Sequence, residues 1–423
     1  METKLIKRYP LGNPDRIWRQ DNFIISTFNA SAKDMRLAFT NLKEAYFNLA
    51  ETGWIPKERC DEAIAIAEET GLDILIQNWN YFGGFQDSRK TEIVPEELAA
   101  YIEKTKKYRH IYGYYVWDEP FHAPDIAKAA EQTNVIEALD PSRMPFSVAL
   151  PSYNLAYTYA NGQYESYLEN FVTTINPPVM SLDYYPFALL HPSDKEQLDH
   201  CEIYKDLFLM RKWSLKKNMP LWFYYQGTGD LASCNLSPRQ ITMQVNLALL
   251  YGAKGIQHYT VIGPVIDKYG EKGDYYEHIK TLNRRIAMWG RTLMALTSTG
   301  VYHSDDVLAN DPSFRADFCD HFKDSAVFAD TLPLRTSVGE FVDSDGNRYV
   351  ILLNRDYINP SEISLKLAKT SRIYEVDEVY GRQHMVSKTV KSLKAELRPG
   401  EAKLYRIQDA KEPAYLVDYI LEK

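Results

Sequence analysis

The first 298 residues contain eight short apolar runs, and longer segments with helical periodicity separate them. Ile279, Leu282 and Ile286, for example, recur at steps of three and four. Strands that alternate with helices form a parallel sheet, and eight such units predict a (β/α)8 TIM barrel. The turn after the first run, NASAKD, lacks the GxGxxG pattern of a nucleotide-binding doubly wound sheet. The predicted strands are FIISTFN, AYFNLAE, LDILIQN, IYGYYVWDE, MPFSVALP, VMSLDYYP, PLWFYYQ and GIQHYTV, beginning near residues 23, 45, 72, 111, 144, 179, 220 and 255.

The hydrophobic pattern changes after about residue 298. Ile363, Leu365 and Leu367 alternate with polar residues, which is the period of a strand with one buried face. Asp345-Gly346 is a typical hairpin turn. We therefore predict a catalytic (β/α)8 barrel domain over residues 1–298 and a small antiparallel β-sandwich domain over residues 299–423. The last segment, EPAYLVDYILEK, is expected to add a helix or a strand.

Length and composition narrow the classes of protein that fit this pattern. The 423 residues suit a barrel with a second, smaller domain, and the net charge of -8 disfavours a nucleic-acid binder. No stretch reaches the ~20 continuous apolar residues of a membrane span. The start, METKLIKRYPLGNP, shows no signal peptide, so a cytoplasmic protein is the default expectation, although a trimmed exported chain would look the same. Four cysteines without CxxC spacing predict neither a zinc site nor a disulfide framework. No cofactor is expected, and the oligomeric state does not follow from the sequence.

Polar and aromatic side chains gather where the eight predicted strands end. Active sites of such barrels lie at the carboxyl ends of the strands, so these residues are the candidates for function. They are acids, amides and aromatic rings, with no Lys or Arg that would bind a phosphate or a carboxylate. This set suits a neutral, hydroxyl-rich ligand, and we predict a carbohydrate substrate; no set of metal ligands stands out. The candidate substrate-binding residues are Asn29, Asn78, Trp79, Trp117, Tyr184, Tyr225, Gln226, His258 and Tyr259.

The most informative strand end is GYYVWDEPF, residues 113–121, where Asp118 and Glu119 follow an apolar run. Glycoside cleavage usually needs one carboxylic acid that protonates the leaving oxygen. Glu119 follows Trp117 and stands beside a second carboxylate, and both neighbours are expected to raise its pKa. The alternative is that the two acids only open the next helix, but Pro124 is a better candidate for the helix start.

The segments YVWDEP and YGAKGIQHY resemble the TIM-barrel glycoside hydrolases of clan A, including the family 42 β-galactosidase group. The resemblance implies a catalytic barrel followed by a β-domain, and hydrolysis of O-glycosidic bonds in an oligo- or polysaccharide. It implies that Glu119 is the general acid/base, in the position of the Glu in the clan's Asn-Glu-Pro motif. Asp118 stands where the clan has Asn.

The chain departs from that clan at the end of the seventh predicted strand, where Gln226 occupies the position of the nucleophilic Glu. An amide cannot act as that nucleophile. The favoured substitute is Asp183, acting as nucleophile or as base for water. A second alternative is hydrolysis of an acetamido sugar by Asp118 and Glu119, with Tyr225 holding the acetamide group. Neighbouring strand residues face opposite sides, so that alternative needs a bend at the strand end.

Three further alternatives stay open. The barrel could bind carbohydrate without catalysis. A misplaced seventh strand would make Asp230 the second carboxylate. A lyase or isomerase would need a metal cluster or a cationic clamp, and the strand ends show neither.

Overall fold

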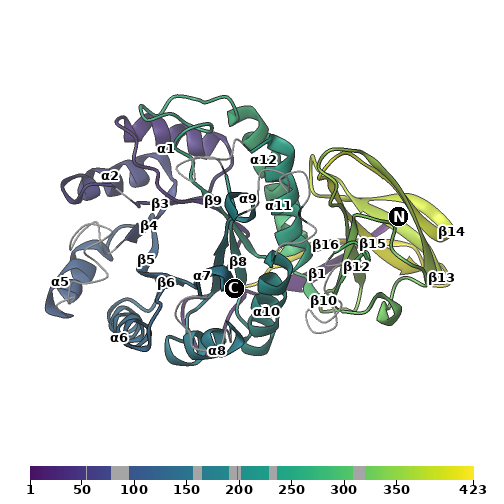
Figure 1. Cartoon of the computed structure of the whole chain (residues 1–423), viewed down its shortest axis with the longest axis horizontal. Helices are drawn as coiled ribbons and strands as arrows, with labels where there is room; N and C mark the ends of the chain where they lie inside the picture. The colour runs from purple at the N-terminus through teal and green to yellow at the C-terminus, as the bar shows by residue number, and fades with distance from the viewer. Residues whose placement is uncertain are drawn as a thin grey trace.

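The structure is a computed structural model that describes residues 1–53, 55–77, 95–155, 164–189, 198, 202–227, 236–307 and 320–423. Eight parallel strands form the sheet at its centre (Figure 1): β2 (Ile24–Thr27), β3 (Leu49–Glu51), β4 (Asp73–Gln77), β5 (Ile111–Asp118), β6 (Met144–Val148), β7 (Met180–Tyr184), β8 (Leu221–Gln226) and β9 (Gly255–Tyr259). Their hydrogen-bonded order is β6-β5-β4-β3-β2-β9-β8-β7. A parallel bridge between Ala149 and Leu182 brings the two edges together. The predicted barrel and all eight of its strands are confirmed.

Helices surround the barrel on its outer side (Figure 1). They begin where the sequence carries capping signals: Ser237 accepts a hydrogen bond from the amide of Gln240, and Pro238 stands in the first turn of its helix. Two single-turn helices follow strands at the carboxyl end of the barrel. The helices are α1 (Met35–Glu44), α2 (Cys60–Thr70), α5 (Pro95–Thr105), α6 (Ala123–Leu139), α7 (Ser152–Leu155), α8 (Tyr164–Thr174), α9 (Pro186–Leu189), α10 (Ile203–Lys217), α11 (Pro238–Leu250) and α12 (Tyr276–Leu293).

Aromatic side chains fill much of the inside of the barrel. The ring of Phe146 lies 5.0 Å from that of Tyr115 and 5.6 Å from that of Trp222, between centroids. Such closely packed rings make the described interior of the barrel a solid core. The residues at its carboxyl end therefore stand on a rigid support. The buried members of this interior cluster are Trp18, Ile24, Phe28, Leu49, Leu75, Tyr115, Met144, Phe146, Val148, Val179, Tyr185, Trp222 and Tyr224.

A single antiparallel sheet forms most of the C-terminal part. Its order is β10-β11-β12-β15-β13-β14, from β10 (Thr297–His303), β11 (Thr336–Val342), β12 (Arg348–Asn354), β13 (Ser361–Val376), β14 (Gln383–Leu397) and β15 (Ala402–Asp409). The expected all-β domain is confirmed. Its core joins Leu365 and Leu393 of the long β13–β14 hairpin to Val338 and Leu352 of the other strands. The predicted β-sandwich is thus built from one sheet whose strands pack around a shared core.

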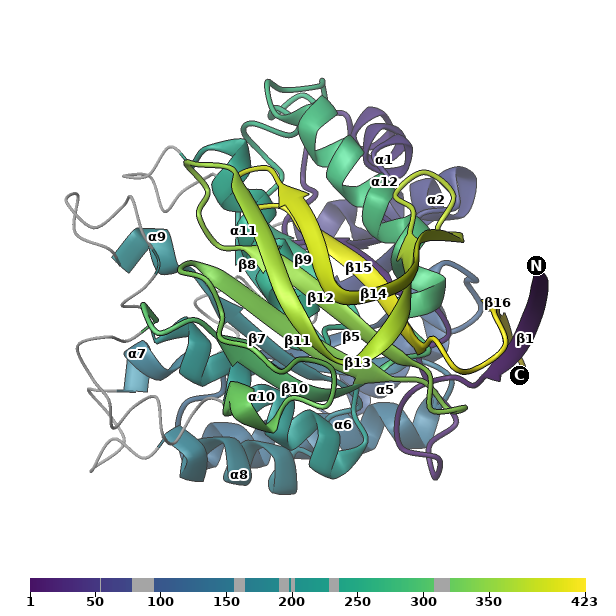
Figure 2. The same cartoon turned by 90° about the vertical axis from the view of Figure 1, so that its right-hand side faces the viewer.

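The all-β domain packs beside α11 and α12 of the barrel (Figures 1 and 2). The side chain of Asn246 donates a hydrogen bond to the carbonyl of Gly400 (2.7 Å), and the indole of Trp289 donates one to the carbonyl of Val376 (3.0 Å). The two chain ends form a parallel pair, β1 (Glu2–Arg8) with β16 (Tyr415–Leu421), so the last segment is a strand. Among the described helices, none combines the length and apolarity needed to cross a membrane.

Candidate active site

The end of β5 carries Asp118 and Glu119 in a bent backbone. Glu119 has a φ of 51°, in the left-handed region that residues other than glycine seldom adopt. Its amide still bonds the carbonyl of Val148, at 3.2 Å. The following helix, α6, begins at Ala123, where Asp125 accepts a hydrogen bond from the amide of His122. The two acids therefore precede the helix and do not open it. An unusual backbone conformation of this kind is common in functional sites.

The carboxyl groups of Glu119 and Asp183 lie near one another at the carboxyl end of the barrel. Asp183 is the fourth residue of β7 and is only 7% exposed. Burial is the main cause that raises the pKa of Asp183 well above its usual value, and the charges of Glu119 and Asp118 add to it. Because the charges of both Asp118 and Glu119 act on Asp183, the last residue of β5 and the residue after it lie at the same site. The site thus holds a carboxyl pair in which burial and the neighbouring charges favour the protonated form of Asp183.

A third and a fourth carboxyl group extend this cluster into the barrel. Asp118 accepts a hydrogen bond from the hydroxyl of Tyr115 (2.9 Å). Glu51, at the end of β3, is fully buried and accepts hydrogen bonds from Tyr224, Gln257 and Ser26. Burial raises the pKa of Glu51 to about 8, against the opposing effect of these three donors. Glu51 is therefore mostly protonated and uncharged at neutral pH, and it lies deeper in the barrel than the carboxyl pair.

Three aromatic rings form a wall beside the carboxyl pair. The ring centroid of Tyr259 lies 4.7 Å from that of Tyr185 and 5.4 Å from that of Phe28, with tilts of 30° and 32°. The charges of Asp183 and Glu119 both contribute to the raised pKa of Tyr185, so the wall adjoins the pair. Aromatic faces next to carboxyl groups can bind the C–H faces and the hydroxyl groups of a sugar.

The structure directs four other candidates away from this site. Trp117 and Tyr184 lie in the large cluster between the strands and the helices. Tyr225 lies in the same cluster, and its hydroxyl bonds Nδ1 of His258 at 2.8 Å. His258 packs edge-on against Phe47, and burial lowers the pKa of His258 to about 3. These placements differ from the expected ones because the four side chains take the outward positions of their strands. The acetamide-holding role of Tyr225 therefore has no support from its position.

Gln226 and Asn29 stabilise local backbone at strand ends. The side-chain oxygen of Gln226 accepts hydrogen bonds from the amides of Phe187 (2.9 Å) and Ala188 (3.2 Å), in the first turn of α9. That of Asn29 accepts bonds from the amide and the hydroxyl of Ser31. Asn78, Trp79 and Asp230 lie outside the described residues. Within the described ranges, no group of three or more His, Cys, Asp or Glu side chains is arranged to hold a metal ion.

The structure also adds residues that the sequence did not single out. Tyr115, Tyr185, Tyr224 and Gln257 all point into the barrel, together with Glu51. Glu51 and Tyr185 stand at predicted strand ends, and period-two alternation from Asp183 would have selected Tyr185 over Tyr184. For Glu51 the available signal was a lone acid at the end of an apolar run. No local pattern marked Tyr115 or Gln257, which lie within apolar runs.

No protein-family model and no curated protein sequence matches the chain. Several solved structures match its fold. The GH27 β-L-arabinopyranosidase of Geobacillus stearothermophilus aligns over 93% of this chain and 98% of its own, at 10% identity and a TM-score of 0.53. The GH51 arabinofuranosidase of Xanthomonas axonopodis pv. citri aligns over 94% and 98%, at 11% identity and a TM-score of 0.47. The first likeness establishes the class of fold: a TIM barrel with a β-domain, as in that glycosidase. The resemblance to family 42 stays a prediction.

Proposed function

We propose that this protein is a glycoside hydrolase in which Glu119 and Asp183 are the two catalytic carboxyl groups. The observation that carries the proposal is that buried Asp183 lies near Glu119 and Asp118, at the carboxyl end of a TIM barrel and beside an aromatic wall. Most glycosidases need one protonated and one ionised carboxyl group at the scissile bond. Two neighbouring carboxyl groups favour a singly protonated pair, and such a pair supplies both forms at once.

The raised pKa of Asp183 supports a particular division of roles. Sequence resemblance favours Glu119 as the acid, but burial and two neighbouring charges favour the proton on Asp183. In our proposal, ionised Glu119 attacks the anomeric carbon while Asp183 gives its proton to the departing glycosidic oxygen. Asp183 then takes a proton from water, whose oxygen attacks the same carbon and releases Glu119.

The nearness of the two carboxyl groups favours retention of the anomeric configuration. Retaining enzymes hold them about 5–5.5 Å apart, whereas inverting enzymes leave about 6.5–9.5 Å for a water molecule. The effect of Glu119 on the pKa of Asp183 favours the shorter separation. The aromatic rings of Phe28, Tyr185 and Tyr259 would provide the platform for the sugar ring.

Aryl glycosides of graded leaving-group ability test the proposal and the roles together. Asp183→Asn should lose about 10²–10⁴-fold in kcat on poor leaving groups. On dinitrophenyl glycosides, the rate of its first chemical step should stay close to that of wild type, and added azide should restore turnover. Glu119→Gln should lose activity on substrates with poor leaving groups and on those with good ones. A matched control is Asp61→Asn, at a carboxylate exposed on α2 and paired with Lys104, which should behave as wild type.

Other outcomes are equally informative. The reverse pattern between the two variants would return the acid role to Glu119. Full activity of either variant would refute the assignment of Glu119 and Asp183 as the two catalytic carboxyl groups. Retained affinity for sugars with no turnover by the wild-type protein on any glycoside would indicate a carbohydrate-binding barrel without catalysis.

A further inference from the structure

We infer that Tyr357, in the all-β domain, is a positioning residue for the strand end that carries Asp183. The inference rests on the proposed function, because it assigns a role around the same carboxyl pair. Tyr357 lies between β12 and β13, 174 positions along the chain from Asp183. The sequence contains no signal that connects the two. The connection is made through α9, the short helix that follows β7.

The helix α9 lies between the barrel interior and the all-β domain. On one side, Ala188 packs against the interior cluster that contains Tyr185. On the other side, the buried ring of Phe187 meets the ring of Tyr357 edge to face, with centroids 5.8 Å apart and an angle of 76°. Only Tyr184, Tyr185 and Pro186 separate Phe187 from Asp183 along the chain. A shift of Phe187 would therefore move the backbone that orients Asp183.

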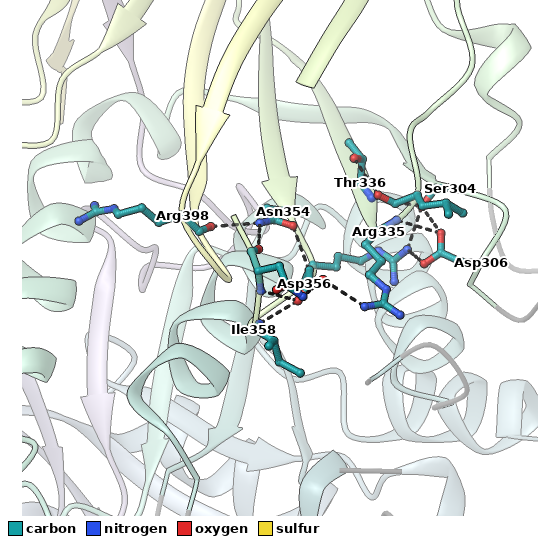
Figure 3. Close-up of polar contacts among 11 residues, drawn as sticks. Ser304, Asp306, Arg335, Thr336, Asn354, Asp356, Ile358 and Arg398 are labelled. Carbon is teal, nitrogen blue, oxygen red and sulfur yellow. Dashed lines mark hydrogen bonds and ion pairs between the residues drawn. The ribbon is translucent and has the colours of Figure 1, made fainter. Parts of the chain in front are cut away.

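The loop that carries Tyr357 is held rigidly by polar contacts. Asp356 accepts hydrogen bonds from the amides of Ile358 (2.8 Å) and Asn359 (2.9 Å), and Arg335 donates to its other oxygen at 3.1 Å. Asn354 donates to the carbonyls of Asn359 (2.9 Å) and Arg398 (3.2 Å). Figure 3 shows Asp356 and Asn354 as the two centres of this network. The ring of Tyr357 therefore stands on a firm support.

The same loop is also tied directly to the barrel. Arg355 is buried and forms an ion pair with Asp306 at 2.8 Å. Its guanidinium carbon lies 5.7 Å from the ring centroid of Tyr204 in α10, and one nitrogen donates to the Tyr204 hydroxyl at 3.4 Å. The loop thus contacts α9 through Tyr357 and α10 through Arg355, the two helices that follow β7 along the chain. The all-β domain thus acts as a brace for this end of the site.

Removal of the brace should affect catalysis more than binding. Small displacements of catalytic groups can lower rates by about 10²-fold, because reacting atoms leave their productive geometry. We expect Tyr357→Leu to lower kcat by about 10- to 100-fold with KM within about threefold of wild type. Tyr357→Phe keeps the ring and should restore the wild-type kcat. Ile358→Ala, at the next residue of the same loop with its side chain 44% exposed, is the matched control and should change neither constant.

Hydrogen exchange followed by mass spectrometry gives a measurement that does not depend on activity. Tyr357→Leu should accelerate exchange in peptides covering residues 180–189, while Tyr357→Phe and Ile358→Ala should not. If Tyr357→Leu folds, turns over substrate like wild type and exchanges like wild type, the inference is wrong although the proposed function stands. If the wild-type protein hydrolyses no glycoside, the proposed function fails. Faster exchange in Tyr357→Leu would then still support the brace, and unchanged exchange would overturn it.

Discussion

The hydroxyl of Tyr167, in α8, joins the two chain segments that leave β5 and β6. It donates a hydrogen bond to the carbonyl of Pro120 (3.1 Å) and accepts one from the amide of Leu150 (2.9 Å). Pro120 immediately follows Glu119, whose backbone has the left-handed conformation. Tyr167 is fully buried, so no solvent can replace its hydroxyl at these two backbone groups. This contact holds the bend that directs Glu119 toward Asp183.

Tyr167→Phe should therefore weaken both stability and turnover. The substitution leaves a buried carbonyl and a buried amide without partners, which should lower the free energy of unfolding by about 1–3 kcal/mol. Loss of the bend should lower kcat by about tenfold. Urea titrations and steady-state kinetics measure the two effects.

Tyr164→Phe is the control for that prediction. The ring of Tyr164 stacks on Tyr167 at 6.0 Å and is also buried, but its hydroxyl has no hydrogen-bond partner within the described part of the chain. Its removal should change the free energy of unfolding by less than about 0.5 kcal/mol, or stabilise the fold. Equal losses in the two variants would contradict the bridging role of Tyr167.

Asp118→Asn should shift the alkaline side of the pH profile. The ionised carboxylate of Asp118 contributes to the raised pKa of Asp183. Proton donation by Asp183 is lost as the pH rises through that pKa, so kcat/KM falls on the alkaline side. Without the Asp118 charge, the pKa of Asp183 falls and the alkaline limb should move to lower pH. An unmoved limb, or one moved to higher pH, would exclude Asp183 as the group that must be protonated.

Glu51→Gln should stabilise the protein at alkaline pH. An unfolded chain ionises Glu51 near pH 4.3, whereas burial raises the pKa of the folded carboxyl to about 8. Between these values the unfolded state binds fewer protons, so the wild-type protein loses stability as the pH rises. The variant has no such group to ionise and should not lose this stability. In urea titrations, its free energy of unfolding relative to wild type should be higher at pH 8 than at pH 5 by a few kcal/mol.

Glu44→Gln provides a comparison of opposite sign. Hydrogen bonds from Lys272 and Lys280 lower the pKa of exposed Glu44 to about 2. The stability that its ionised form contributes is present above the unfolded pKa, so its removal should weaken the protein at neutral pH and not at pH 2. If Glu51→Gln showed the same dependence as Glu44→Gln, Glu51 would be ionised in the folded protein.

Gln226→Glu tests whether the end of β8 can still supply a nucleophile. The variant keeps an acceptor for the amides of Phe187 and Ala188 but adds a buried negative charge. Because the proposed pair is Glu119 and Asp183, we expect kcat to fall and not to rise. Gln226→Ala removes the acceptor and should lower the free energy of unfolding by about 1–2 kcal/mol. Higher turnover in Gln226→Glu than in wild type would point to a clan A arrangement.

The barrel was predictable because its strands are buried on both faces. Such strands appear in the sequence as nearly continuous apolar runs, and all eight were found. The pairing of β1 with β16 was not predictable, since β1 is mostly exposed and its partner begins 413 residues later, at Tyr415. The length of β13 was not predictable either, since its pairing with β14 is irregular between Lys366 and Ile373.

The candidate site divides in the same way between sequence and structure. Apolar runs stop at Asp118, Glu119 and Asp183, so the position of these acids at strand ends was visible in the sequence. Which side chains face the site depends on contacts in the folded protein. A register shift in β5 between Tyr115 and Trp117 interrupts the alternation, so Tyr115 and Asp118 point inward while Trp117 points outward. The left-handed backbone of Glu119 then turns a neighbouring residue toward Asp183. Both features depend on pairing with β6 and on the support of Tyr167, which are contacts between segments distant in the sequence.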